Sequence, residues 1–366
     1  MEVIFTILTV VFVLYGYFLL RLAYGCGKLK SFTTTPDSLP KNKFSVVVPF
    51  RNEKENLSRL LSSFEKLYYP KEMFEVLLVD DFSDDGFQAS GANFQLSTIQ
   101  NNRKTASPKK DAICTAIKKA KYDWIITTDA DCEVSEKWLL TLDNFIQKNL
   151  KTEMVCGMVL TYSNGSFFQD FQKLDFMSLQ STTIGSFGMG NPFMCNGANF
   201  AYKKSLFQSL NGFSGNENIA GGDDVFMLQK AVKNYTERVS FLKSQDYLVM
   251  TRAAESWKAL FFQRVRWASK TKAYISLYAK TLAVMVFFGN FGFIIALFLT
   301  LSDPKYLFFI GFKIVIDRLL IGQTKRFSDK LGGITYLFSS VFYPFFCVAV
   351  AVYSLFGKYS WKGRKF

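Results

Sequence analysis

Asp129 and Asp131 are the residues of this chain whose type and spacing point most directly to chemistry. They are separated by one residue and follow Trp124–Thr128, a short apolar run typical of a buried strand. If the extended backbone continues, both carboxylates lie on one side and can share a divalent cation. The sequence has no histidine, which excludes Ser-His-Asp catalysis and histidine-ligated zinc. We therefore expect oxygen ligands and a hard cation, Mg²⁺ or Mn²⁺.

Two more polar segments follow apolar runs earlier in the chain. Asp80 and Asp81 follow Phe74–Val79, and Pro49–Glu53 follows Phe44–Val48. A single acidic strand end is usually a turn or a helix cap. Three polar strand ends in one sheet favour a binding site instead, because ligands of parallel α/β sheets bind beyond the carboxyl ends of the strands.

Helices must connect these strands if the sheet is parallel. Apolar residues recur at helical spacing within Glu55–Tyr68, and Asp111–Ala120 also has a helical pattern. Buried-type strands that alternate with helices predict an α/β fold with a mostly parallel sheet.

Six segments between about residues 43 and 270 resemble, in order, the motifs of family 2 glycosyltransferases. They are Val46–Leu57, Val76–Gly86, Thr128–Cys132, Asn196–Asn199, Gly222–Asp224 and Gln263–Trp267. A D-x-D pair alone is a weak signal, but six motifs in register are a strong one. The resemblance implies a GT-A fold, that of nucleotide-diphospho-sugar transferases, in a membrane-bound protein of bacterial type.

The resemblance assigns several residues to the donor side. Pro49, Glu53 and Asp81 would contact uridine, and Asp131 with Asp129 would hold the metal and the diphosphate. The alternative is structural: Pro49 ends a strand, Glu53 caps a helix, and the two later aspartates form a capping turn.

Lys109 matches the lysine of a G-K-x-x-A-L motif that usually lies near the donor. Here Pro108 replaces the glycine, and Lys110 is a second candidate for the same role. A solvated basic turn explains these residues equally well.

On the acceptor side, the resemblance makes Asp224 the general base, with Asp223 as the alternative. Inverting transfer needs a carboxylate that takes the proton of the acceptor hydroxyl as this oxygen attacks the anomeric carbon. Gly197 and Asn199 would belong to the acceptor-side loop. A turn after two glycines is the structural alternative for Asp224.

Gln263, Arg266 and Trp267 carry a Q-x-x-R-W motif. Arg266 can reach a pyrophosphate oxygen, and Trp267 can stack on a ring or lie at a membrane interface. A basic interfacial helix is the alternative, because further cations, Arg264 among them, lie nearby.

Three uncharged apolar segments predict membrane helices: Val3–Leu20, Leu282–Ser302 and Ile334–Gly357. A fourth, Tyr306–Gly322, contains Lys313 and Asp317, whose spacing allows an ion pair on one helix face. Whether this segment spans the membrane or lies in its interface stays open.

The positive charge is concentrated toward the two ends of the chain. The net charge is +14, of which residues 1–30 carry +2 and residues 276–366 carry +8, leaving +4 for the middle. We therefore expect an anchor at 1–30, a cytosolic GT-A domain at 31–275 and a membrane region at 276–366. The basic ends indicate contact with membrane lipids, and the nearly balanced middle argues against nucleic acid.

These observations lead to a working hypothesis. The chain would be an integral membrane enzyme of the bacterial inner membrane, with the catalytic domain in the cytosol. It would transfer a sugar, with inversion, from a nucleotide-diphosphate donor, expected to be UDP-linked, to a lipid or lipid-linked glycan. A processive polysaccharide synthase of the same fold is the alternative. A non-enzymatic membrane scaffold or sensor is more remote, because it predicts loss of the acids at the strand ends.

Overall fold

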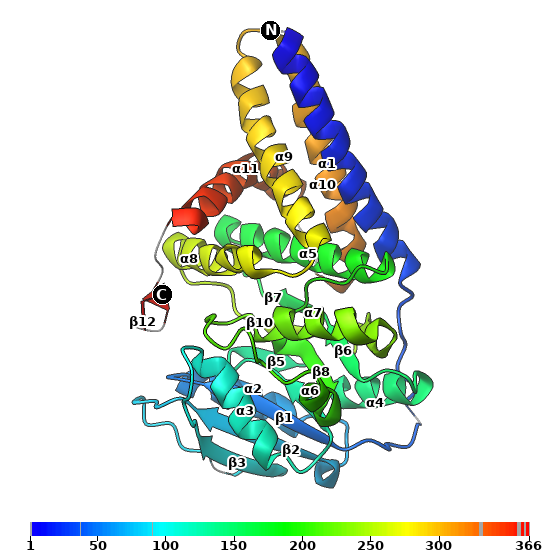
Figure 1. Ribbon diagram of the computed structural model, residues 1–366, viewed down its shortest axis with the longest axis vertical. Coiled ribbons are helices and arrows are strands. Elements are labelled where there is room, and N and C mark those ends of the chain that lie inside the picture. The colour runs from blue at the N-terminus through cyan, green and yellow to red at the C-terminus, as the bar shows by residue number, and fades with distance from the viewer. Residues whose placement is uncertain are drawn as a thin grey trace. The chain divides into compact units, whose positions relative to one another are not determined.

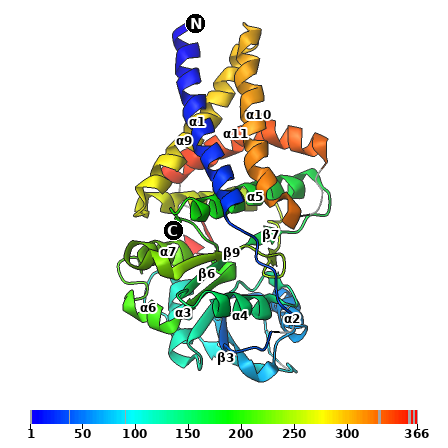
Figure 2. The ribbon, with the colours of Figure 1, turned by 90° about the vertical axis from the view of Figure 1, so that its right-hand side faces the viewer.

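The computed structural model describes residues 2–36, 38–89, 91–328, 332–356, 360–361 and 364–365. The chain divides into two compact units (Figures 1 and 2). Unit 1 comprises Met1–Leu29, Thr161–Phe193 and Ala253–Phe366, and unit 2 comprises Lys30–Leu160 and Met194–Arg252. The predicted boundaries differ from this division, since residues 161–193 and 253–275 group with the terminal helices and not with the sheet.

Unit 2 is built on a seven-stranded mixed sheet of order β3-β2-β1-β4-β8-β6-β9. Strands β1 (Phe44–Phe50), β2 (Phe74–Asp80), β3 (Gln95–Gln100) and β4 (Trp124–Thr127) are parallel neighbours. The three predicted strands are therefore confirmed. They are buried on both faces, which explains their continuous apolar pattern. Strand β3 escaped prediction because it is a polar, mostly exposed edge strand.

In the other half of the sheet, only β8 runs opposite to the remaining strands. Strand β8 (Phe200–Lys203) pairs antiparallel with both β4 and β6 (Met154–Gly157), and β9 (Val239–Leu242) pairs parallel with β6. A second sheet has the order β5-β10-β7, formed by Cys132–Val134, Val249–Thr251 and Val159–Thr161. Two short strands, β11 (Ser360–Trp361) and β12 (Arg364–Lys365), pair near the C-terminus.

Helices flank the large sheet. Helix α3 packs on β1 and β2, and α2 packs beside β5. The helices of unit 2 are α2 (Lys54–Glu65), α3 (Pro108–Lys119), α4 (Trp138–Lys148), α6 (Lys204–Ser209) and α7 (Asp223–Tyr235). Helices α2 and α3 correspond to the two predicted helices, with shifted ends. This mixed sheet with flanking helices is the predicted α/β architecture.

Unit 1 is helical. Helix α1 packs against α5, α9 and α10, and α11 packs against α5, α8 and α9. In both views α1, α9 and α10 run side by side, whereas α11 crosses them (Figures 1 and 2). The helices are α1 (Glu2–Lys28), α5 (Phe167–Gly188), α8 (Trp257–Ala268), α9 (Leu277–Leu299), α10 (Leu307–Ile321) and α11 (Gly333–Phe356).

Glycines allow α1 and α5 to approach closely. A Cβ atom on Gly185 would lie 2.3 Å from the Leu22 carbonyl oxygen, and one on Gly188 would lie 1.9 Å from the Gly25 carbonyl oxygen. Neither distance is possible for a real side chain, so glycine is required where these backbones meet.

Helices α1, α9 and α11 are long and apolar enough to cross a membrane. They contain the three predicted segments, apart from their ends; Gly357 lies outside the described residues. Helix α10 holds the fourth segment. Its Lys313 is 1% exposed, and Lys313 Nζ lies 2.6 Å from Asp317 Oδ2, as the spacing predicts. Tyr15 of α1 donates a hydrogen bond to Asp317 Oδ1.

Candidate functional site

Lys109 lies at the centre of the candidate site in unit 2. Its Nζ is 2.6 Å from Asp129 Oδ1 and 3.5 Å from Asp223 Oδ2. Burial lowers the pKa of Lys109, but the charges of Asp129, Asp223 and Asp224 raise it more, so that it stands well above its ordinary value. A protonated lysine therefore joins a carboxylate that follows β4 to one that begins α7.

The structure shows how proline is accommodated before this lysine. Pro108 is the first residue of α3, a position where its missing N–H has no helical partner. Lys109 and Lys110 consequently lie in the first turn of a helix and not in a solvated basic turn. Their side chains diverge: Lys110 is 1% exposed and bonds to other groups.

Asp224 is held in a fixed orientation by two backbone groups. Its Oδ2 accepts the Gly197 N–H at 2.8 Å, and its Oδ1 accepts the Val225 N–H at 2.7 Å. Asp224 is the second residue of α7, where the positive end of the helix dipole favours a carboxylate. Each carboxylate oxygen has two lone pairs, so this geometry leaves acceptor capacity for a substrate hydroxyl.

Gly197 allows the loop before β8 to approach these acids. A Cβ atom on Gly197 would lie 3.1 Å from Asp223 Oδ2 and 3.4 Å from the Asp224 Cβ. The Gly197 carbonyl accepts a hydrogen bond from Thr127 Oγ1 at 2.7 Å. The end of β4, the loop at Gly197 and the start of α7 are thus tied together.

Asn199 of the same loop is fully buried. Its side chain is 0% exposed, and its Nδ2 donates to the carbonyls of Met158 and Tyr247 at 2.9 and 2.8 Å. Its Oδ1 accepts a hydrogen bond from Trp138 Nε1 at 3.0 Å. Asn199 therefore shapes the acceptor-side loop from the interior and does not present its side chain at a surface.

Asp129 and Asp131 do not continue a strand. Strand β4 ends at Thr127, and the Cys132 N–H donates to the Asp129 carbonyl at 3.2 Å, which closes a turn. The expectation that strand alternation aligns the two carboxylates is wrong, because the backbone turns here before β5. Both residues are half-buried, and they follow the carboxyl end of β4 as expected.

The chemistry of this turn fits a hard divalent cation. Two carboxylates supply oxygen ligands of the kind that Mg²⁺ and Mn²⁺ prefer. Among the described residues, no group of three His, Cys, Asp or Glu side chains could hold a metal ion.

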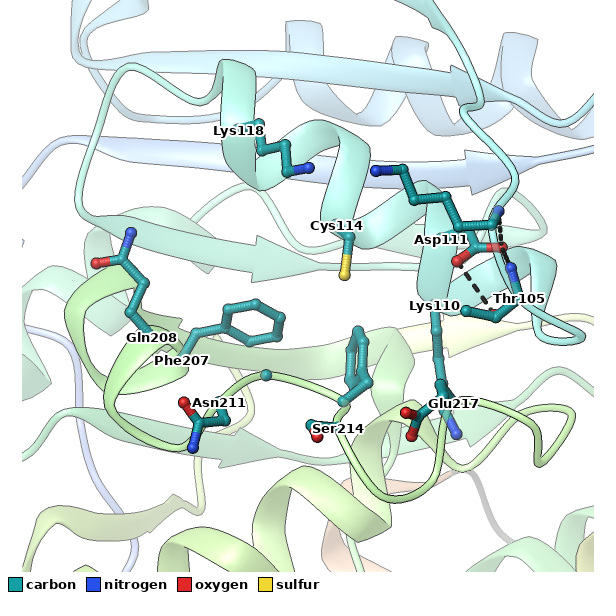
Figure 3. Close-up of a pocket in the computed structure, with 13 residues that line it drawn as sticks. Thr105, Lys110, Asp111, Cys114, Lys118, Phe207, Gln208, Asn211, Ser214 and Glu217 are labelled. Atoms are coloured by element: carbon teal, nitrogen blue, oxygen red, sulfur yellow. Dashed lines mark hydrogen bonds between the residues drawn. The ribbon is translucent and has the colours of Figure 1, made fainter.

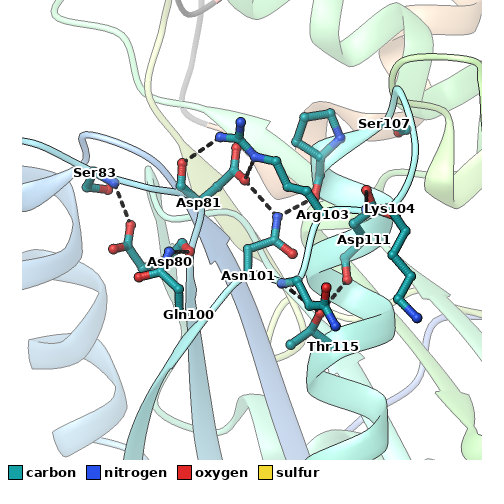
Figure 4. Close-up of polar contacts among 12 residues, drawn as sticks. Asp80, Asp81, Ser83, Gln100, Asn101, Arg103, Lys104, Ser107, Asp111 and Thr115 are labelled. Carbon is teal, nitrogen blue, oxygen red and sulfur yellow. Dashed lines mark hydrogen bonds and ion pairs between the residues drawn. The ribbon is translucent and has the colours of Figure 1, made fainter.

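Asp81 follows β2 and takes part in an ion pair that the sequence did not indicate (Figure 4). Its Oδ1 accepts hydrogen bonds from Arg103 Nε at 2.6 Å and Asn101 Nδ2 at 2.7 Å. The Arg103 guanidinium also lies 4.7 Å from the centre of the Phe82 ring. Arg103 carries no motif of its own, and only the adjacency of β2 and β3 brings it to Asp81.

Pro49 and Glu53 both lie near the carboxyl end of β1. We expected Pro49 to end the strand, but it lies within β1 and pairs with Val79 of β2. The residues of β1 that pair with β4 end at Val47, two residues before Pro49. Its missing N–H is tolerated because β4 stops short of it. Glu53 precedes α2, but its side chain makes no cap; Glu53 Oε2 accepts from Asn56 Nδ2 at 2.5 Å.

The Q-x-x-R-W residues Gln263, Arg266 and Trp267 lie on α8 of unit 1. Between them, Arg264 is 6% exposed, and its Nε donates to Asp175 Oδ2 of α5 at 2.5 Å.

Arg264 also packs against aromatic rings, with its guanidinium 4.2 Å from the Trp267 ring centre. Gln263 Oε1 accepts a hydrogen bond from Arg264 Nη1. Arg264 is therefore a buried structural cation, which removes it from the basic membrane face considered as the alternative.

Comparison with known proteins relates this geometry to a family. Residues 45–210 match the model of the family described as glycosyl transferase family 2. The matched segment includes β1, the acids after β2 and β4, Lys109 and the Gly197 loop.

Several named proteins are similar over parts of their length. The chain is 22% identical over 286 residues to the probable glycosyltransferase YdaM of Bacillus subtilis, covering 70% of this chain and 63% of YdaM. It is 31% identical over 127 residues to the glycosyltransferase AglE of Haloferax volcanii, covering 33% of this chain and 41% of AglE. The chain thus spans less than two thirds of either relative.

A solved structure with a similar fold covers nearly the whole chain. It is the mannosyltransferase PcManGT of Pyrobaculum calidifontis, in complex with GDP-Man and Mn²⁺, with a TM-score of 0.60 and 16% identity. The match covers 97% of this chain and 99% of that chain. At this identity the likeness establishes the fold, which is of the GT-A type.

Proposed function

We propose that the chain, whose residues 45–210 match the glycosyl transferase family 2 model, is a membrane-bound inverting glycosyltransferase. It transfers a sugar from a nucleotide-diphosphate donor to a lipid or lipid-linked glycan. The observation that carries the proposal is the bridge from Asp129 through Lys109 to Asp223, next to the oriented Asp224. This arrangement places a positive charge that can bind a diphosphate next to a carboxylate that can take the proton of an acceptor hydroxyl.

On the donor side, Lys109 and the D-x-D turn have complementary roles. Asp131 and Asp129 would hold Mg²⁺ or Mn²⁺, which neutralises charge on the departing diphosphate. Lys109 carries a positive charge beside Asp129 and can exchange part of this contact for a phosphate oxygen. Asp81, Glu53 and Pro49 lie at neighbouring strand ends, as a nucleoside site requires.

The donor nucleotide is proposed to be uridine-linked. PcManGT was solved in complex with GDP-Man, so the test includes both UDP- and GDP-linked donors.

On the acceptor side, Asp224 takes the hydroxyl proton while that oxygen attacks the anomeric carbon from the face opposite the diphosphate. Two N–H donors hold the carboxylate in place, so it needs little reorganisation during the reaction. Asp223 Oδ2 lies 3.5 Å from Lys109 Nζ, and we assign the base role to Asp224, which two backbone N–H groups orient.

The three apolar helices support a membrane location for the acceptor. We propose the bacterial inner membrane, with the catalytic unit in the cytosol, where nucleotide sugars are made. The donor-side roles of Gln263, Arg266 and Trp267 in the Q-x-x-R-W motif stay predictions from the sequence.

The test uses the purified full-length protein in nanodiscs, with labelled UDP- and GDP-sugars and membrane lipid extract. We expect sugar transfer that EDTA abolishes and that Mn²⁺ or Mg²⁺ restores. Asp224→Asn should lower kcat by roughly 10²–10⁴-fold, because it removes the general base. Its donor affinity should stay within about twofold, since only a transition-state contact is lost. Asp131→Asn should instead weaken metal-dependent donor binding.

Two outcomes would overturn the proposal or change it. Full activity of both variants would remove the proposed mechanism. A ladder of long products would favour the processive synthase, whereas a single added sugar supports transfer to a lipid or lipid-linked acceptor without polymerisation.

A further inference from the structure

The segment between α6 and α7 has an unusual backbone. We refer to residues 210–222 as the glycine loop, and it ends directly before Asp223 and Asp224. Positive φ angles occur at Asn211, Gly212, Gly215, Gly221 and Gly222. Such a loop loses much conformational entropy when it adopts one shape, so its order requires contacts from elsewhere.

Lys110 of α3 provides one such contact. Its side chain is 1% exposed and enters the region beside the glycine loop (Figure 3). Lys110 Nζ donates to the carbonyl oxygens of Asn216 and Ile219 at 2.5 and 3.0 Å. The same ammonium lies 5.1 Å from the centre of the Phe226 ring of α7. Lys110 thus links three elements: α3, the glycine loop and α7.

Lys230 of α7 holds the other part of the loop. Its Nζ donates to the carbonyl oxygens of Leu210, Gly212 and Ser214 at 3.4, 2.8 and 2.6 Å. Together the two lysines engage five backbone carbonyls of the glycine loop. Their contacts lie on separate residues, which indicates that they hold separate parts of one loop.

We propose that Lys110 and Lys230 are positioning residues that hold the glycine loop and thereby fix Asp224 at the start of α7. The inference rests on the proposed function, because it assigns these lysines to the placement of the acceptor base. Their hydrogen bonds go to the loop backbone, whereas the donor-side ion pair is formed by Lys109 and Asp129.

Two neighbouring lysines of α3 connect the donor side of the site to the glycine loop. Lys109 and Lys110 are adjacent, yet one reaches Asp129 and Asp223 while the other reaches the glycine loop. A single helical turn therefore carries the donor-side charge and one anchor of the loop that precedes the base. The first turn of α3 sets the spacing between the two halves of the site.

The protonation state of Lys110 does not decide this role. Burial lowers its pKa to about 8, against the opposing charges of Asp223, Asp224 and Glu217, and Lys230 lowers it further. A neutral amine keeps two N–H donors, which matches the two carbonyls that Lys110 engages. The contacts can persist on both sides of this pKa.

The experiment compares Lys110→Met and Lys230→Met with Lys118→Met in the full-length protein. Methionine keeps an apolar stem of similar length but has no N–H donor. Lys118 is the matched control, because it lies on the same helix as Lys110 and is exposed (Figure 3). Hydrogen exchange is measured on peptides from residues 210–222, together with kcat and the affinity for UDP or GDP with Mn²⁺.

We expect faster exchange of the glycine loop in both test variants and no change in the control. We also expect kcat to fall by about 10–100-fold, the loss typical of hydrogen bonds made by a charged group. Nucleotide affinity should remain within about twofold, because the donor-side contacts are intact. In the double variant, a kcat loss that differs from the product of the single losses would show that both lysines act on one loop.

Unchanged loop exchange in both variants would overturn the inference. An equal loss of nucleotide affinity and kcat would do the same, since it would indicate general disruption of the site. If Lys110→Met does not fold, Lys230→Met decides, because Lys230 is only half-buried. A wild-type protein that binds no nucleotide sugar would contradict the proposed function, and the exchange data would still report separately on the loop.

Discussion

At the scale of single residues, the candidate site is a small set of charges arranged around one cation. Lys109 contacts acids from two segments, and Asp224 is oriented by two backbone N–H groups. These contacts preorganise the acids before substrate arrives, and this is how enzymes limit the reorganisation needed in the transition state. The roles of these residues depend on close approach, of which Gly197 is the clearest case.

Gly197→Ala should damage catalysis more than folding. The added Cβ would lie 3.1 Å from Asp223 Oδ2, so this carboxylate must shift by a few tenths of an ångström, and 3.4 Å from the Asp224 Cβ, an ordinary contact. Overpacking costs about 1–3 kcal/mol, which corresponds to roughly 5–150-fold in kcat if the shift is passed on to the neighbouring base. Steady-state kinetics measure the effect, with Gly27→Ala as a control at a glycine that has open space around it. Equal kcat for Gly197→Ala and wild type would show that these acids can move freely.

Lys110 should give the stability a particular pH dependence. Burial lowers its pKa from 10.5 to about 8 in the folded protein. Between pH 8 and 10.5, Lys110 is more often protonated in the unfolded chain than in the folded protein. The contribution of Lys110 to the free energy of unfolding therefore rises with pH. We would measure thermal unfolding of wild type and Lys110→Met between pH 7 and 10. As the pH rises, the Tm of wild type should increase relative to the Tm of Lys110→Met. A difference that shrinks as pH rises would contradict this assignment.

At the scale of elements, helix ends and helix faces place the charges. The proposed base, Asp224, is the second residue of α7, and the donor-side lysine, Lys109, is the second residue of α3. In unit 1, α10 carries a lysine and an aspartate one turn apart and turns them toward Tyr15 of α1. Buried charges are costly unless they are paired, so this pair allows α10 to pack against α1 and α9.

Breaking the α10 pair on one side should destabilise the helical unit. Asp317→Leu leaves the Lys313 ammonium, which is 1% exposed, without its partner. A buried charge without its partner costs about 3–5 kcal/mol. We expect a lower unfolding temperature in detergent for Asp317→Leu. The double variant Lys313→Met/Asp317→Leu should recover most of the loss, since no charge remains buried; a double variant as unstable as the single one would show that the charges matter for another reason.

At the scale of the whole molecule, the composition and the three apolar helices support membrane association. The apolar helices and the basic termini belong to the ends of the sequence, whereas the acids of the site belong to the sheet unit. Positive charge next to apolar helices is attracted to anionic lipid headgroups. The net charge of +14 is thus a property of the membrane segments more than of the catalytic unit.

The protein should behave as an integral membrane protein. Three helices suited to span a bilayer bury far more apolar surface in lipid than a peripheral contact does. Membranes washed with alkaline carbonate and with high salt should retain the protein, and detergent should release it. Release by salt alone would show that the basic segments, and not the helices, hold it at the membrane.

Local sequence patterns were sufficient to predict the parallel strands, the acidic strand ends and the apolar helices, and they showed that Lys313 and Asp317 could pair. These features depend on local spacing and burial, which hydrophobic periodicity reports directly. The resemblance in motif order was enough to predict the family.

Only the tertiary structure decided which groups meet. It paired Asp81 with Arg103 across neighbouring strands, buried Asn199, turned the backbone at Asp129–Asp131 and assigned Arg264 to Asp175. It also grouped residues 161–193 with the terminal helices. These facts depend on contacts between segments far apart in the chain, and no local pattern encodes which partner a side chain finds when several of the right charge exist.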